Sequence, residues 1–197
     1  YRLRFALDDM SALVKTPLVE LCEALDETLR QDPRGAAVPA LLEAYAKTQT
    51  DWEPFKNFVE GSYTRSLVRR TEDYELLVLS WGAGEESPVH NHMGQRCWMA
   101  VLDGEVEEVH FKRSEDGPGP LVEGPRKRFP KGNVAFINDE IALHLVRGAE
   151  GKAAVSLHLY SKPYDICLVY DPLTGAESAK TLKYDRTEGA LEGELGV

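Results

Sequence analysis

The segment "SPVHNHMGQRCWMAVLDG" contains two histidines one residue apart, His90 and His92, and a cysteine, Cys97, five residues further on. In a strand, residues two apart point to the same face, so the two imidazoles would project together. Imidazole is a common ligand of divalent transition metals, and two rings on one face can converge on one ion. A pair of surface histidines is the alternative, because the bare spacing does not distinguish the two.

A second pattern that could carry chemistry is "SLHLY", in which Ser156, His158 and Tyr160 alternate with leucines. Alternation in a strand places these three polar side chains on one face, opposite an apolar face. Buried polar groups need hydrogen-bond partners, and a Ser–His–Tyr relay would supply them. A hydrogen-bonded polar cluster without chemistry is the alternative.

The elements that must position these residues are a helical front and a strand-rich remainder. Residues 11–31 predict a helix with Thr16 as N-cap, Pro17 in the first turn and Cys22 on its buried apolar face. A second helix is predicted over 38–47. Eight later runs rich in β-branched, leucine and aromatic residues predict strands, at 63–70, 74–82, 97–104, 105–113, 133–139, 141–148, 153–161 and 166–172. Asp103-Gly104 predicts a hairpin between two of them.

This order predicts an all-β core, a β-barrel or sandwich with the N-terminal helices packed outside. We expect residues 1–197 to form a single domain, with a helical part over 1–56 and a barrel over 57–197. The net charge of -10 argues against a nucleic-acid partner, and "RKRFPK" is interpreted as a solvated turn. No apolar run is long enough to span a membrane. Three cysteines without metal-type spacing suggest a reducing compartment, hence a cytoplasmic location.

The spacing around the first histidine pair resembles the first motif of the cupin superfamily, whose fold is a jelly-roll barrel. Gly124 and Pro130-x-Gly132 resemble the opening of the second motif. The resemblance implies that His144, in "NDEIALHLV", is a third metal ligand, whereas a core histidine is the alternative. Many metal-binding cupins have Glu at the position of Cys97. Three neutral imidazoles without it would leave an open site that attracts a thiolate, which favours catalysis over a closed structural zinc site.

Five blocks resemble mammalian-type cysteine dioxygenases, in order and at near-constant spacing. They are "LLEAYAKTQTDWEPF", "SYTRSLV", "LLVLSWGAGEESPVHNHM", "VAFINDEIALHLV" and "AVSLHLYSKPYDICLVYDPLTG". The resemblance implies a non-haem dioxygenase with one mononuclear Fe(II). It would oxidise the thiol of L-cysteine to cysteine sulfinic acid, with both atoms of O2 going to sulfur, a step of cysteine catabolism and taurine biosynthesis.

By the same resemblance, His90, His92 and His144 hold the iron, and Arg65 pairs with the substrate carboxylate. A guanidinium can grip a carboxylate through two hydrogen bonds, although a surface arginine is the alternative that the sequence alone favours. Tyr63 lies on the same strand face and would line the pocket.

Further roles follow for the strand "SLHLY". Tyr160 would stand beside the iron, held by His158, with Ser156 behind it. Cys97 would form a thioether crosslink to Tyr160, whereas a buried small apolar residue is the alternative. His110 receives no role, and Cys167 is expected to be structural.

Lys162 and Leu182 depart from the family pattern. Lys162 replaces a proline, which leaves a cis peptide after Ser161 in question. Leu182 replaces a methionine that lines the pocket.

The expected partners are small molecules, L-cysteine and O2, and the expected state is a monomer. Two other functions stay open: a dioxygenase of another small thiol such as 3-mercaptopropionate, and a non-catalytic metal-binding cupin. Oxygen uptake with each thiol would separate them.

Overall fold

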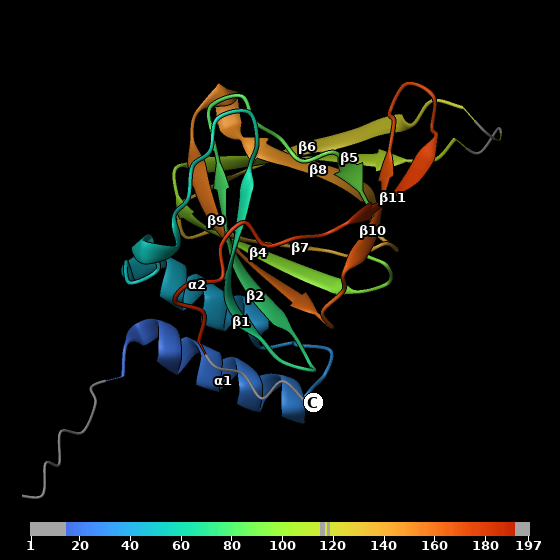
Figure 1. The fold of residues 1–197 in the computed structure, drawn as a ribbon. Coiled ribbons are helices and arrows are strands. Elements are labelled where there is room, and N and C mark those ends of the chain that lie inside the picture. The colour runs from blue at the N-terminus through green and yellow to red at the C-terminus, as the bar shows by residue number, and fades with distance from the viewer. Residues whose placement is uncertain (1–14, 115–116, 118, 192–197) are drawn as a thin grey trace, which may run out of the picture.

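The computed structural model describes residues 15–114, 117 and 119–191 (Figure 1). In this part of the chain two helices and a 3-10 turn come first, and eleven strands follow with a second 3-10 turn between β8 and β9. Their bounds are α1 Pro17–Gln31, α2 Val38–Thr48, η1 Glu53–Phe55, β1 Thr64–Arg70, β2 Glu75–Trp81, β3 Val89–His90, β4 Arg96–Asp103, β5 Glu105–Lys112, β6 Val122–Pro130, β7 Val134–Ile137, β8 Leu143–Gly148, η2 Ala149–Gly151, β9 Ala154–Ser161, β10 Ile166–Tyr170 and β11 Glu177–Thr181.

The strands form two antiparallel sheets. One has the order β1-β2-β9-β4-β7 and the other the order β11-β10-β3-β8-β5-β6. A buried apolar cluster draws side chains from both sheets, among them Met99 of β4 and Val146 of β8, so a core lies between them. The prediction of an all-β cupin-type core is confirmed. That residues 1–197 form one domain stays a prediction.

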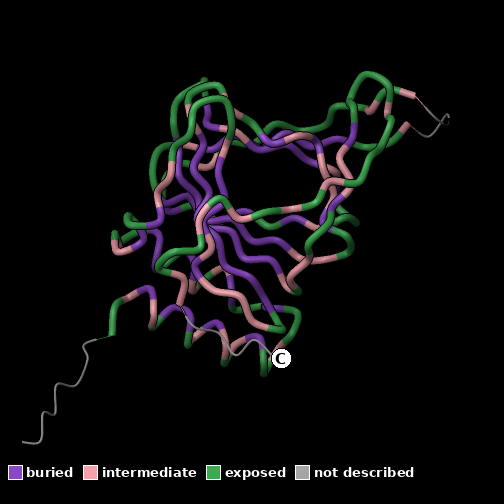
Figure 2. The backbone as a smooth tube through the Cα atoms, in the orientation of Figure 1, coloured by how far each residue is buried: buried purple, intermediate pink, exposed green. Residues whose placement is uncertain are grey.

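The two helices cover the outer face of the five-stranded sheet, as expected (Figures 1 and 2). The Thr16 side chain caps α1 by accepting a hydrogen bond from the backbone N–H of Val19, and Leu25 and Leu29 on its inner face are buried. The side chains of strand β9 differ between the two faces of this sheet. Its apolar residues Val155, Leu157 and Leu159 pack in the cluster that contains the helices, which leaves its polar residues for the interior between the sheets.

Asp103-Gly104 does not form the predicted hairpin. β4 pairs with β7 and β9, whereas β5 pairs with β6 and β8, so the turn carries the chain from one sheet into the other. Gly104 has φ 71°, a conformation that suits glycine, and its carbonyl accepts a hydrogen bond from the Lys131 backbone. The local turn chemistry was correctly identified, but it does not determine which strands pair.

The segment "RKRFPK" is exposed as predicted, but most of it lies in strand β6 and not in a turn. β6 and β11 were not predicted, and the strand expected to hold both His90 and His92 is β3, which ends at His90 and leaves His92 outside it. β6 is polar and exposed, β3 has two residues, and β11 reads "ESAKT", so none has the apolar alternation that indicates a strand. α1 begins at Pro17 and not at Ser11, and residues 11–14 lie outside the described residues. Neither described helix is long and apolar enough to cross a membrane.

Candidate active site

Three histidines meet between the sheets. His90 of β3 lies directly opposite His144 of β8, and cross-strand partners point to the same face of a sheet. His92 follows two residues after His90. One nitrogen from each ring lies within 4.8 Å of the others, and the Nε2 atoms of His90 and His144 are 3.2 Å apart. Such a group can hold a metal ion.

Contacts outside this group fix two of the rings. The Nδ1 atom of His90 is 2.9 Å from the carbonyl oxygen of Pro88, and that of His144 is 2.7 Å from Oε1 of Glu108, so each Nε2 is turned toward the centre. A carboxylate or carbonyl on the far nitrogen is the usual support of a metal-bound histidine. Removal from water lowers the pKa of His90 to about 3 and that of His144 well below its usual value. Both rings are therefore neutral, the form that binds a metal.

His92 is fully buried, and neither ring nitrogen has a hydrogen-bond partner among the residues that the structure describes. Its backbone N–H donates to Asp139, which also accepts from the backbone of Gly94. Buried imidazole nitrogens rarely stay unpaired in proteins. This unpaired donor atom beside two oriented Nε2 atoms fits a divalent transition metal.

The Ser–His–Tyr face of β9 forms the predicted hydrogen-bonded relay. Ser156 Oγ lies 2.9 Å from Nε2 of His158, whose Nδ1 lies 3.2 Å from the Tyr160 hydroxyl. Trp81 of β2, which the sequence did not single out, donates its Nε1–H to Ser156 Oγ at 2.8 Å. Burial lowers the pKa of His158 to about 3 and raises that of Tyr160 well above its usual value. The imidazole and the phenol are therefore both neutral.

Cys97 lies directly opposite Tyr160 in the register of β4 and β9, so both side chains point between the sheets. Its Sγ atom is 3.9 Å from Nδ1 of His158, and burial raises the pKa of its thiol. The pair is thus adjacent, as a crosslink requires. Formation of the bond stays a prediction.

Arg65 of β1 is only 7% exposed, which excludes the surface-arginine alternative. One guanidinium nitrogen, Nη2, lies 3.6 Å from Oε1 of Glu75, while Nη1 is buried without a hydrogen-bond partner in the described part of the chain. Burial alone would lower the pKa of Arg65, but Tyr160 and Glu75 outweigh it and raise that pKa, so the group stays charged. A buried cation with a free donor can bind a carboxylate.

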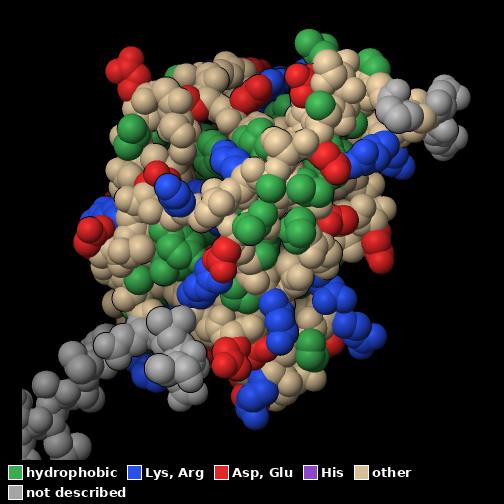
Figure 3. All heavy atoms as spheres, turned by 45° about the vertical axis from the view of Figure 1, so that its right-hand side comes forward, with side chains coloured by type: hydrophobic (Ala, Val, Ile, Leu, Met, Phe, Trp, Pro, Cys, Tyr) green, Lys and Arg blue, Asp and Glu red, His purple; other side chains and the backbone are tan. Residues whose placement is uncertain are grey.

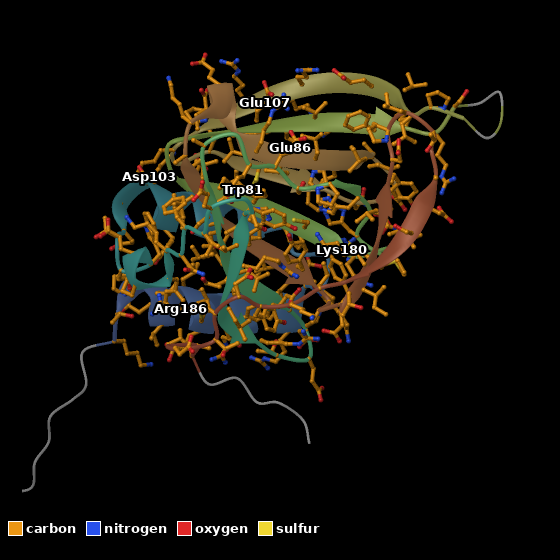
Figure 4. The ribbon with its side chains drawn as sticks, turned by 45° about the horizontal axis from the view of Figure 1, so that its top comes forward. Trp81, Glu86, Asp103, Glu107, Lys180 and Arg186 are labelled. Carbon is orange, nitrogen blue, oxygen red and sulfur yellow. The ribbon has the colours of Figure 1, made fainter. Side chains whose placement is uncertain are left out.

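One pocket between the sheets is lined by Arg65, His90, His144, His158 and Tyr160. Its walls also include Tyr63, which stacks on Trp81 with ring centroids 4.9 Å apart, and Leu182. Trp81 of β2 and Lys180 of β11, labelled in Figure 4, belong to opposite sheets and both line the pocket. Tyr63 and Leu182 thus lie where the resemblance places them. Cys167 also lines the pocket, although it was expected to be only structural.

Sequence reasoning missed two buried carboxylates, Glu75 and Glu108. Glu75 is fully buried behind Arg65 and accepts a hydrogen bond from Tyr184. Glu108 lies between His144 and His110. The Nε2 atom of His110 is 3.3 Å from the second carboxylate oxygen of Glu108, so His110 contacts the group that supports His144. The available signal was an acidic residue inside a run predicted to be a buried strand. The peptide between Ser161 and Lys162, left in question above, is cis.

Comparison with known proteins shows which family this chain resembles. The family model described as cysteine dioxygenase type I matches residues 8–172. The chain is 33% identical to cysteine dioxygenase type 1 of Homo sapiens over 197 residues, covering 96% of this chain and 98% of that protein. It is 32% identical to cysteine dioxygenase type 1 of Rattus norvegicus over 170 residues, covering 85% of each. A solved structure from Klebsiella pneumoniae, an uncharacterized protein with a double-stranded β-helix domain, aligns with TM-score 0.48 at 15% identity, covering 68% of this chain and 92% of that one.

Proposed function

The chain belongs to the cysteine dioxygenase type I family, and from this premise we propose that it uses one ferrous ion, held by His90, His92 and His144, to convert L-cysteine into cysteine sulfinic acid. That the enzyme is a cysteine thiol dioxygenase follows from the family itself. The proposal concerns the ion, the product and the roles of the residues. The observation that carries it is the convergence of ring nitrogens from three histidines, of which the buried His92 has no hydrogen-bond partner among the described residues, in the same site as a buried, unpaired nitrogen of Arg65.

A bound ferrous ion would supply coordination positions for the substrate thiolate and for O2, so that both oxygen atoms reach sulfur without an external reductant. The protein contributes three imidazole ligands and no carboxylate, so the charge of such an ion would stay uncompensated and would favour a thiolate. Glu108 and the Pro88 carbonyl keep two of these rings in the metal-binding orientation.

Arg65 binds the substrate carboxylate through Nη1 and so fixes which end of cysteine faces the histidines. The free donor is already desolvated, which makes its hydrogen bond to a carboxylate stronger than one at the surface. Glu75 supports the guanidinium from the other side at 3.6 Å. Tyr63, stacked on Trp81, closes the pocket next to it. Arg65 thus acts by orientation, which accelerates a reaction between two bound groups.

Tyr160 supplies a hydroxyl donor at the reacting end of the pocket. Trp81 can only donate, so Ser156 accepts from it, and the Ser156 hydroxyl can then donate to Nε2 of His158. In this assignment the neutral His158 carries its proton on Nδ1, and this N–H donates a hydrogen bond to the Tyr160 oxygen. The Tyr160 O–H is then free to point at the substrate or at oxygen. We propose that Cys97 is joined to the ring of Tyr160 by a thioether, which would hold that hydroxyl in place.

We also propose that the protein is a cytoplasmic monomer and that it binds no nucleic acid. Lys and Arg side chains are interspersed with Asp and Glu on the face in Figure 3, and the net charge is -10, which does not favour a polyanion. The three cysteines, all described, are buried and free, as is typical of proteins in reducing compartments.

The test is the product of an aerobic incubation of the ferrous protein with L-cysteine. We expect a product that is heavier by two oxygen atoms, both labelled when 18O2 is used. The disulfide cystine as the product, or no oxygen uptake, would contradict the proposal. A higher kcat/KM for 3-mercaptopropionate than for cysteine would assign the chain to another thiol. His144→Ala is the control, because it removes one of the three ring nitrogens and is expected to abolish uptake.

A further inference from the structure

Lys180 is turned toward the pocket although it comes from an exposed strand. It is half-buried, whereas the other four residues of β11 are exposed. It lies directly opposite Cys167 of β10, which is buried and lines the pocket. Since cross-strand partners share a face, the Lys180 side chain is directed inward with Cys167.

The Lys180 side chain lines the same pocket as Arg65 and is more exposed, so it lies nearer the surface. Its Nζ atom is 5.7 Å from the centroid of the Tyr63 ring, a cation–π contact. A second cavity adjoins the pocket and shares Tyr63, Arg65, Lys180 and Leu182 with it. Arg65 and Lys180 therefore border the same two cavities.

The charges around this space are unbalanced. The second cavity has three cations, Arg65, Lys180 and Lys183, against one acid, Asp185, whose Oδ2 already accepts the backbone N–H of Arg65. Within residues 15–114, 117 and 119–191 no carboxylate forms an ion pair with Lys180. Among the described residues, the carboxylate that pairs with the Arg65 guanidinium is that of Glu75, 3.6 Å from Nη2. Two cations along one wall repel each other unless an anion lies between or beside them.

We propose that Lys180 forms a second anion-binding subsite, next to Arg65, through which the pocket binds small thiols that carry two carboxylates. The proposal rests on the proposed function, since it assumes that Arg65 takes the first carboxylate. Arg65 would hold that carboxylate at the inner end of the pocket, and the Lys180 ammonium would pair with the second one toward the opening. Lys180 is thus a specificity-determining residue, which favours anionic thiols over neutral and cationic ones.

Two thiols that differ by one carboxylate provide the test, 3-mercaptopropionate and mercaptosuccinate. Their dissociation constants are measured by calorimetry under nitrogen, on the iron-loaded wild-type protein and on Lys180→Met, whose side chain is unbranched and one atom shorter but carries no charge. We expect the variant to bind mercaptosuccinate about three- to tenfold more weakly, as for one partly exposed charge pair. The Kd of 3-mercaptopropionate should change less than twofold.

Lys183→Met is the matched control, because Lys183 lines the second cavity but is exposed and does not line the pocket. It should leave the ratio of the two dissociation constants unchanged. Equal losses for both thiols in Lys180→Met, or the same change of ratio in Lys183→Met, would overturn the subsite. Either result would leave the proposed oxidation of cysteine standing. Conversely, if cysteine binds but is not oxidised, the proposed function fails while the ratio still tests Lys180.

Discussion

The guanidinium of Arg65 shows how much of the site depends on the shape of a charge as well as its sign. Arg65→Lys keeps the cation, but an ammonium cannot present two parallel N–H groups to a carboxylate. Its contact toward Glu75 would also change, because that contact is made by Nη2. We expect KM for cysteine to rise and kcat/KM to fall by roughly 10- to 100-fold, the usual effect of spoiling a buried charged contact. Steady-state oxygen uptake measures both constants.

A matched substrate controls this experiment. Cysteamine lacks the carboxylate, so whatever activity the wild type has toward it should be nearly the same in Arg65→Lys. If the variant lost activity equally on both thiols, Arg65 would have a structural role and not a carboxylate-binding one.

Cys97 and Tyr160 are adjacent residues whose chemistry can be followed without activity. A thioether between them removes two hydrogen atoms from the chain and ties β4 to β9 between positions already in register. This is a two-electron oxidation with O2 as the oxidant, so we expect wild-type protein incubated in air with iron and cysteine to show a second, faster-migrating band on a denaturing gel. Cys97→Ser and Tyr160→Phe are tested separately. The serine variant cannot form the band. The phenylalanine variant also breaks the contact between the Tyr160 hydroxyl and His158. A faster band that persists in Cys97→Ser would rule out this crosslink.

At the scale of elements, the turn at Gly104 carries the chain between sheets and can be tested by one methyl group. A Cβ atom there would lie 2.8 Å from the carbonyl oxygen of Ala153, and φ is 71°. Gly104→Ala therefore adds a steric clash to backbone strain, and we expect a loss of roughly 2–4 kcal/mol in the free energy of unfolding. Chemical denaturation measures this loss.

Gly84→Ala separates strain from clash. Gly84 also has positive φ, 82°, but a Cβ atom there would meet nothing within 4 Å among the described residues. Its loss should be about 1 kcal/mol, from strain alone. Equal losses at the two positions would show that contact with Ala153 does not matter.

The same elements show what the sequence could predict. Alternation in "AVSLHLY" predicted both faces of β9 and the Ser–His–Tyr relay, because the strand is long and each face has one polarity. The sheet partners of β4 and β5 could not be predicted, since pairing depends on contacts distant in the chain. The roles proposed for the metal ligands depended on the resemblance, because two histidines alone have an equally good surface interpretation. Lys180 was missed because its polar strand β11 was not predicted, and Glu75 because an acidic residue in a predicted strand does not show that it faces Arg65.

At the scale of the whole molecule, the buried interior makes stability depend on pH, and His158 allows one contribution to be isolated. Its pKa is about 3 in the folded protein, against 6.5 in an unfolded chain. Between these values the unfolded chain binds one proton more, so the free energy of unfolding falls as pH falls below about 6.5 and is unaffected by this group above it. His90 and His144 act in the same direction, because their pKa values are also lowered. The raised pKa values of Glu75 and Glu108 oppose the trend at lower pH.

Comparison of wild type with His158→Gln, both treated with a chelator, cancels these shared contributions. Glutamine can still contact Ser156 and Tyr160 but does not titrate. Its free energy of unfolding should therefore fall less steeply between pH 7.5 and 5.5, by about 1 kcal/mol over that interval. Urea denaturation at several pH values gives the two slopes, whatever the absolute stability of the variant. Parallel slopes would mean that His158 binds a proton in the folded state. At mildly acidic pH Nε2 of His158 would then carry a proton and could no longer accept from Ser156, so the relay behind Tyr160 would be disrupted and oxygen uptake should fall over the same interval.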